Sequence, residues 1–470
     1  MNVFMKHRIV SVMLLAVLPF TASSAQCFED FFEDRTLRVD YIFSGDSRHQ
    51  QISLDELHCS EGWYGRRVNM DRLLLQGNGQ LTMTDTLGRD TLYRHSFSSL
   101  FQEWQTAEEA TRLWRSFENV FLLPMPREAV DVEVTLTDTH NRVTSRLRHR
   151  VDPKDILLRP LQPMAGVSWK YLRRSGDSRQ KIDVAFVAEG YRRGEMKRFF
   201  RDCRESIDAL LDHSPFREMA DRFNFIAVAA PSEQSGVSIP HKGDWRQTVL
   251  GSSFDTFYSD RYLTTLHLKR LHDVLATVPY EHIIILANTD NYGGGGIYNS
   301  YLMSAAHNAK SRPVVVHEFG HSFSGLADEY YYDDQYETSY PADTEPWEPN
   351  LTTLVDFSAK WADMLQPGCP VPTPPSGKEV YTAVGVFEGG GYQSHGVYRP
   401  AQECRMKINE APVFCPVCMR AIRRIIDYYT EERHSLSENG APLCVVRVPT
   451  CGTCLHANVV CGGTWCSGRG

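Results

Sequence analysis

The chain has 470 residues, of which 42% are hydrophobic, 23% charged and 11% aromatic. That balance is ordinary for a folded globular protein, so it excludes a disordered, collagen-like or coiled-coil chain. The formal net charge of -8 excludes the basic surface by which proteins hold nucleic acid or anionic lipid. The length predicts roughly two or three domains, each large enough to bury a core.

The first 25 residues resemble a secretory signal peptide in composition and order. Lys6 and Arg8 precede an apolar run at residues 9–20, and small residues at 23–25 suit a cleavage site. The run is too short to span a bilayer, which takes about 20 apolar residues. We therefore expect residues 1–25 to be removed and the protein to be exported to the periplasm, the cell surface or the medium. Its 12 cysteines would then meet an oxidising compartment.

Residues 26–152 have the pattern of β-strands. Apolar and polar side chains alternate with a period of two at residues 37–43 and 130–136, and turn-forming residues separate such segments. One short helix is expected over residues 107–118. We predict an all-β, sandwich-like N-terminal domain.

A connector with three prolines, residues 153–178, leads to a region in which strands and helices alternate. From residue 179 to residue 430 this alternation predicts a sheet flanked by helices. Strands are expected at residues 182–188, 223–230 and 282–287, and helices at 193–212 and 261–275. Four consecutive glycines, Gly293–Gly296, suit a backbone that lies close to another part of the molecule.

The strongest chemical signal is the sequence His-Glu-Phe-Gly-His at residues 317–321. His317 and His321 are four residues apart, so on a helix both imidazoles lie on one face and can bind one metal ion. Glu318 lies beside that metal without being placed to bind it. Such a carboxylate suits a general base that takes a proton from water and returns it to a leaving amine. Zinc is the expected ion because three nitrogen and oxygen ligands leave a fourth position for water.

The third ligand has two candidates. The helix is expected to end at Gly325, and the chain must then turn back toward the metal. We favour Asp328 as the ligand, with Glu329 as its rival, although both acids could instead be solvated. The tyrosines at 330–332 are expected to pack, and one of them could hydrogen-bond a transition-state oxyanion. The competing interpretation, a surface helix with two unrelated histidines, does not explain the apolar helix, the glycine stop and the carboxylate together.

HEFGHSFSGLADEY, residues 317–330, resembles the active-site segment of the bacterial secreted zinc metallopeptidases of the immunoglobulin A peptidase type, family M64. The upstream β region also resembles that family's N-terminal domain. The resemblance covers about residues 170–430 and includes ordered motifs at 348–350, 360–361, 385–392, 396–400, 404–406 and 414–418.

The resemblance implies a metzincin-like α/β catalytic domain. Met406 would form a methionine turn under the zinc, and the strand around Tyr292–Ser304 would be an edge strand that pairs with an extended peptide. The spacing departs from the common metzincin motif HExxHxxGxxH, because the glycine comes one residue later and Asp328 stands as third ligand.

The predicted function is therefore a secreted zinc-dependent endopeptidase, with His317, His321 and Asp328 on the metal and Glu318 as base and then acid. The alternatives are a zinc-dependent amidase or deacylase acting on glycan or peptidoglycan, and a binding protein with a structural metal site. An open edge strand favours a peptide substrate, and a structural site has no use for a base. No nucleic-acid partner or transmembrane segment is expected, and the sequence specifies neither the physiological substrate nor the oligomeric state.

Disulfides are the expected state of most cysteines, whereas Cys203, within a predicted helix, is expected to be a buried free thiol. Cys27 and Cys59 are candidates for a bridge in the N-terminal domain. Near the methionine turn, bridges are favoured over a structural zinc or a redox motif among Cys369, Cys404, Cys415 and Cys418. In the Cys- and Gly-rich tail, residues 431–470, local disulfides are favoured over a zinc knuckle.

Overall fold

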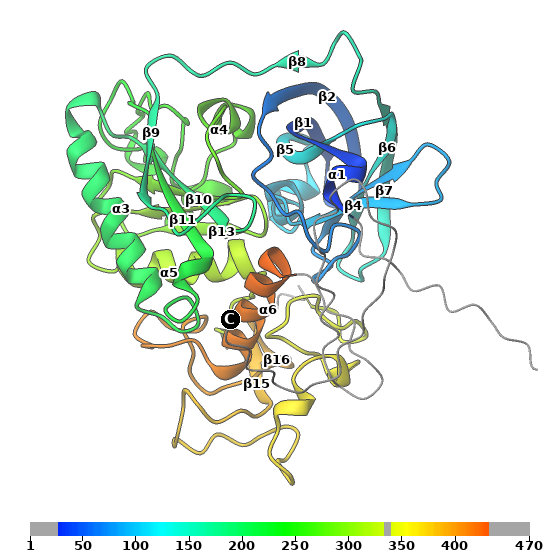
Figure 1. The fold of residues 1–470 in the computed structure, drawn as a ribbon. Coiled ribbons are helices and arrows are strands. Elements are labelled where there is room, and N and C mark those ends of the chain that lie inside the picture. The colour runs from blue at the N-terminus through cyan, green and yellow to red at the C-terminus, as the bar shows by residue number, and fades with distance from the viewer. Residues whose placement is uncertain (1–26, 333–339, 432–470) are drawn as a thin grey trace, which may run out of the picture. The chain divides into compact units, whose positions relative to one another are not determined.

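The computed structural model describes residues 27–332 and 340–431 (Figure 1). The predicted signal peptide, and all but the first residue of the predicted tail, lie outside these ranges. No helix in the part of the chain so described is long and apolar enough to cross a membrane.

Two four-stranded sheets form the N-terminal part of the chain, in agreement with the alternating pattern (Figure 1). Their strand orders are β5-β1-β2-β8 and β4-β3-β6-β7, and all pairs except β2–β8 are antiparallel. The sheets face each other through aromatic side chains: the Phe97 and Phe121 rings are 4.4 Å apart, and Tyr41 Oη lies 2.6 Å from His149 Nε2. The strands are β1 Phe32–Gly45, β2 Gln50–Glu61, β3 Gly79–Asp85, β4 Thr91–Phe97, β5 Arg115–Pro126, β6 Val130–Thr137, β7 Val143–Val151 and β8 Arg159–Pro160, after the short helix α1 Phe28–Phe31.

The prediction of a helix over residues 107–118 is wrong. The chain forms a one-turn helix earlier, α2 (Leu100–Trp104), and then only the 3-10 turn η1 (Glu108–Thr111). Ser99 caps α2 by accepting the N–H of Gln102. From Arg115 onward the backbone pairs with β1, so tertiary pairing overrides the local helical preference of the Ala- and Glu-rich segment.

A six-stranded sheet forms the second part, with the order β13-β14-β12-β10-β11-β9. The central strands β10, β11, β12 and β14 run parallel, whereas β9 and β13 are antiparallel edge strands. The predicted strands at 182–188, 223–230 and 282–287 are all present. The strands are β9 Ser168–Arg173, β10 Ile182–Glu189, β11 Phe223–Ala229, β12 His282–Ala287, β13 Gly294–Ile297 and β14 Tyr301–Ala305, followed by the hairpin β15 Phe387–Gly390 and β16 Gln393–Arg399.

Helices and N-terminal residues cover the two faces of this sheet. One face packs against α3, α5 and α6, and the other joins a core shared with α4 and the N-terminal sheets. This double coverage explains why the central strands are continuously apolar. The helices are α3 Met196–Leu211, α4 Leu268–Val274, α5 Ser311–Ser324 and α6 Pro416–Thr430, with 3-10 turns η2 Arg193–Glu195, η3 Ala220–Arg222, η4 Pro240–Lys242, η5 Thr256–Tyr258, η6 Phe357–Ala359 and η7 Ala362–Met364.

Two expectations for this part need correction. The helix predicted at 261–275 starts only at Leu268, because Thr264 bridges to Ser253 in an extended conformation. The predicted connector contains β9, which pairs with β11 at the edge of the sheet. The predicted division into domains at 26–152 and 179–430 stays a prediction.

The expected disulfides are also absent, because all seven cysteines of the described ranges are free thiols. Cys27 contacts the Glu29 carboxylate at 3.2 Å, and Cys59 accepts from Arg35 at 3.5 Å. Cys369 contacts Thr373 at 3.5 Å instead of another cysteine. An oxidising compartment permits disulfides, but it does not bring sulfur atoms within bonding distance.

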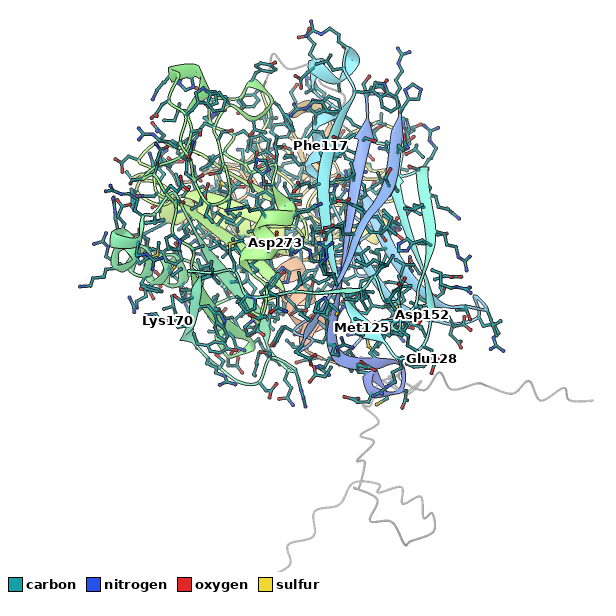
Figure 2. The ribbon with its side chains drawn as sticks, turned by 90° about the horizontal axis from the view of Figure 1, so that it is seen from above. Phe117, Met125, Glu128, Asp152, Lys170 and Asp273 are labelled. Carbon is teal, nitrogen blue, oxygen red and sulfur yellow. The ribbon has the colours of Figure 1, made fainter. Side chains whose placement is uncertain are left out.

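A buried ion pair ties the N-terminal sheet to α4. Arg38 on β1 binds Asp40 at 2.7 Å and Asp273 at 2.6 Å, and Arg38 and Asp40 are almost completely buried. Asp273, labelled in Figure 2, lies on the side of α4 that faces this sheet. Arg38 therefore has a partner in each part of the chain.

We expect the Asp40→Ala substitution to lower the free energy of unfolding by about 3–5 kcal/mol, because it leaves the Arg38 guanidinium buried beside an empty partner position. Denaturant titration measures this loss. The control is Glu108→Ala, which removes an exposed pair with Arg112 and should change stability by less than about 1 kcal/mol. Equal effects of the two substitutions would contradict the structural role of the buried pair.

Candidate metal centre and its cleft

Helix α5 contains the His-Glu-Phe-Gly-His sequence, and one side of the helix is accessible to solvent. Phe319 and Phe323 are buried against the sheet, whereas His317, Glu318 and His321 are partly exposed. The helix ends where the sequence predicted, because Gly325 follows it in the left-handed conformation with φ of 60°. The chain then reverses and reaches Asp328.

Three side chains converge on one point. His317 Nε2 lies 3.0 Å from Asp328 Oδ1, His321 Nε2 lies 3.2 Å from the same oxygen, and the two Nε2 atoms are 3.0 Å apart. Ligand atoms about 2.0–2.1 Å from a tetrahedral zinc ion would lie about 3.3 Å apart. The structure thus brings Asp328 to the histidines, whereas Glu329 points away and contacts Cys418 and Asn350.

The hydrogen bonds around the histidines leave lone pairs facing each other. His317 Nδ1 contacts the carbonyl of Arg405 at 2.9 Å, and His321 Nδ1 contacts that of Leu326 at 2.6 Å. A carbonyl cannot donate, so each Nδ1 carries the proton and each Nε2 of a neutral ring carries a lone pair. Asp328 Oδ1 has no hydrogen-bond partner among the described residues. While both rings are neutral, these three acceptor atoms repel one another at this spacing, and a proton on one Nε2 atom or a metal cation relieves that repulsion.

The charged groups of the centre shift each other's pKa values. Burial disfavours the charged form of Asp328, but His321 and His317 outweigh it and lower the pKa of its carboxyl. Burial disfavours the protonated form of His321, but Asp328 outweighs it and raises the pKa of His321 to about 9. Burial also raises the pKa of Glu318, against the effect of the two histidines. The carboxylate of Asp328 is therefore held in the charged form that binds metal.

Tyr392 supports Asp328 from the side away from the histidines. Its hydroxyl donates to Asp328 Oδ2, and its backbone has a φ of 69°, which is rare outside glycine. The sequence pattern predicts no separate role for Tyr392, whereas the tyrosines at 330–332 follow the ligand segment directly. The glycines at 389–391 before Tyr392 were the available signal, because they permit the turn that places this hydroxyl.

We expect Tyr392→Phe to weaken metal binding by about 10–100-fold, because the Asp328 carboxylate, the expected ligand, loses the donor that orients it. Competition with a chromogenic chelator measures the affinity. Tyr398→Phe, a matched change on the neighbouring strand β16, should leave it unchanged. Unaltered affinity in the Tyr392 variant would contradict this orienting role.

Strand β13 passes directly over α5, and its glycines allow that approach. A methyl group on Gly296 would lie 2.5 Å from the carbonyl oxygen of Glu318, and one on Gly294 would lie 3.1 Å from Glu318 Oε1. A larger residue at Gly296 would displace the strand from the helix. The glycine run thus serves a close approach, as its composition predicted, and places the Glu318 carboxylate beside an edge strand.

Met406 lies beneath the same helix. It is fully buried, and a methyl group on Gly320 would come within 2.6 Å of its sulfur. The Met406 carbonyl accepts the N–H of Glu329 at 2.9 Å, and the preceding carbonyl of Arg405 holds His317. The turn at Met406 therefore supports the centre from below.

A cleft of about 990 Å³ opens above these residues. Both parts of the chain line it, since residues of β2, α2 and the turns at β3 and β6 form one wall. Glu103 of α2 accepts a hydrogen bond from Tyr262 at 2.5 Å across the cleft. No local pattern in the N-terminal part of the sequence marks Glu103 as a cleft residue.

Two protein-family models match the chain. The one described as IgA Peptidase M64 matches residues 171–383 and 376–426, and the one described as Peptidase M64 N-terminus matches residues 27–148. A search of curated proteins found no match. The first match contains the whole of α5, Asp328 and Met406, and its family implies peptide-bond hydrolysis with a metal and a protein or peptide substrate. The chain belongs to the IgA peptidase M64 family and is a metallopeptidase.

Proposed function

We propose that this chain is an exported, zinc-dependent endopeptidase. The observation that carries the proposal is the convergence of His317, His321 and Asp328 through three lone-pair atoms, beside Glu318 and at the floor of an open cleft. Two imidazole nitrogens and one carboxylate oxygen suit zinc and leave a coordination position open.

Glu318 is the proposed general base and acid. His317, His321 and Asp328 would hold a zinc ion, which would supply Lewis acidity to polarise the scissile carbonyl and to acidify water. Glu318 accepts the proton of the attacking water and passes it to the leaving amine. Partial burial raises the pKa of this carboxyl, which makes it a better proton acceptor at neutral pH.

The edge strand β13 is the proposed binding site for the substrate backbone. One side of β13 pairs with β14, while on the other side a bridge from Gly294 to Tyr262 is the only pairing among the described residues. An extended peptide can add to such an edge by main-chain hydrogen bonds. This arrangement favours a peptide over a glycan, and the support of α5 by Met406 favours a metzincin-like fold.

Export is proposed from the charged and apolar order of residues 1–25.

The test uses peptides blocked at both ends, because exopeptidases require a free terminus. We expect cleavage at internal bonds, loss of cleavage after treatment with a chelator, and recovery with zinc. Peptidoglycan fragments and N-acetylated sugars serve as the parallel substrates. If these release acyl groups or amines while the blocked peptides stay intact, the amidase or deacylase alternative replaces the proposal.

A further inference from the structure

A second cluster of metal-ligand side chains lies apart from the histidines. The sulfur atoms of Cys404, Cys415 and Cys418 and a carboxylate oxygen of Glu329 all lie within 4.8 Å of one another. All four residues are fully buried, with no exposed side-chain surface. They come from three separate segments: the turn after α5, the turn at Met406 and the first residues of α6.

We propose that this cluster is a structural zinc site with three cysteine ligands and one glutamate ligand. Zinc binds thiolate sulfur at about 2.3 Å, so two sulfurs of a tetrahedral site lie about 3.8 Å apart. The Cys404 and Cys418 sulfurs are 3.8 Å apart, and Cys418 Sγ lies 3.1 Å from Glu329 Oε1. Four ligand atoms fill the tetrahedral coordination of zinc and leave no position for water, which is the arrangement of structural zinc sites.

The surrounding backbone is arranged as it is around metal-bound thiolates. The N–H of Cys415 points to Cys404 Sγ at 3.2 Å, and the N–H of Cys418 points to Cys415 Sγ at 3.5 Å. Cys415 is the N-cap of α6 and Cys418 lies in its first turn, where the helix dipole favours negative charge. These groups stabilise thiolates, which are the form that binds metal.

The carboxylate of Glu329 gives independent support for a cation. Burying an acid without a direct partner is costly, yet Glu329 makes no ion pair within 4 Å among the residues that the structure describes, and the buried Arg399 guanidinium acts on it only from beyond that distance. Asn350 donates to Oε1 at 3.0 Å, while the fully buried Oε2 has no hydrogen-bond partner there. A bound dication would place a positive charge in direct contact with this carboxylate.

The rival interpretations explain the cluster less well. A disulfide joins two sulfurs at about 2.05 Å and would leave one thiol and the carboxylate buried without a purpose. A redox-active Cys-Pro-Val-Cys motif needs a thiol that substrates can reach, and both of its cysteines are fully buried. The expected bridge to Cys369 is also excluded, since that thiol contacts Thr373.

The site would position the catalytic ligands. Glu329 directly follows Asp328, and Cys404 stands two residues before Met406. The N–H of Glu329 is already bonded to the Met406 carbonyl at 2.9 Å. A metal at the cluster would therefore fasten the segment that carries the third ligand to the turn beneath α5 and to the start of α6.

The experiment measures metal in a chain that lacks the histidine site, so its result does not depend on catalysis. Purified His321→Ala protein is loaded with cobalt, and absorption and metal content are recorded. We expect about one equivalent per chain and the intense thiolate-to-cobalt charge-transfer absorption in the near ultraviolet. Cys418→Ser in the same background should lose both, whereas Cys203→Ser, a matched change at a buried cysteine outside the cluster, should keep both.

The comparison of these variants also distinguishes metal bound at the cluster from metal bound by the five cysteines between residues 444 and 466, because those five are unchanged in every variant. If Cys418→Ser fails to fold, Glu329→Gln keeps the three sulfurs and should weaken cobalt binding while retaining the charge-transfer absorption. The proposal is overturned if the His321→Ala protein binds no cobalt, binds it without thiolate absorption, or shows a disulfide among the three cysteines by non-reducing peptide mapping. These outcomes leave the proposed peptidase function untouched.

Discussion

Replacing Glu318 by Gln is expected to lower kcat/KM for a peptide substrate by about 10²–10⁴-fold while the metal stays bound. The amide has the size of the carboxylate but cannot accept the proton of the attacking water. Glu318 is not a member of the metal-ligand cluster formed by His317, His321 and Asp328, so metal content should not change. Kinetics and elemental analysis on the same preparation measure the two effects.

The control for this substitution is Glu410→Gln. Glu410 forms an exposed ion pair with Lys310 at 2.7 Å, next to the start of α5, and should tolerate the change with less than about a twofold effect on rate. A Glu318→Gln protein with undiminished turnover would contradict its role as the base. Loss of metal together with activity would instead mean that Glu318 is a ligand.

The second large effect is expected for His321→Ala, which should lose activity and one equivalent of metal together. The change removes one of three ligands and also leaves Asp328 Oδ1 with a single imidazole neighbour. Asp328→Ala should have the same result, because the geometry assigns that residue, and not Glu329, to the histidines. Elemental analysis after gel filtration measures the metal.

His241→Ala is the matched control, since His241 is half-exposed and pairs with Asp255 on the surface. It should retain full metal content and activity. Retention of the metal by His321→Ala, or loss of it by Asp328→Ala without loss of activity, would contradict the ligand set.

Local patterns were sufficient to predict the parts of the site that lie close together in sequence. His317, Glu318 and His321 share one helix, and the helix stop at Gly325 indicated where Asp328 would return. Tyr392 and Glu103 lie far away along the chain, and only the tertiary fold brings them to the cleft. The glycines before Tyr392 indicate a turn, but no residue next to Tyr392 or Glu103 indicates that either side chain reaches the cleft.

The strands of the fold were predictable for the same reason. Period-two alternation predicted β1 and β6, and continuous apolar runs predicted β10, β11 and β12. Burial of one face of a strand produces the alternation, and burial of both faces produces the continuous run. The helix predicted at 107–118 failed where pairing with β1 overrode local preference. The prediction of disulfides was wrong because it rested on the redox environment alone. The positions of Cys404, Cys415 and Cys418 around Glu329 depend on how three segments that are distant in sequence pack together.

The most direct test of peptidase function uses a complex protein mixture and maps newly formed N-termini by mass spectrometry, with the wild-type protein and Glu318→Gln side by side. We predict new internal termini with the wild type alone, and the residues flanking them would define its cleavage specificity. The same termini in both samples would point to a contaminating protease. No new termini from a fully metal-loaded wild-type protein would contradict a general endopeptidase.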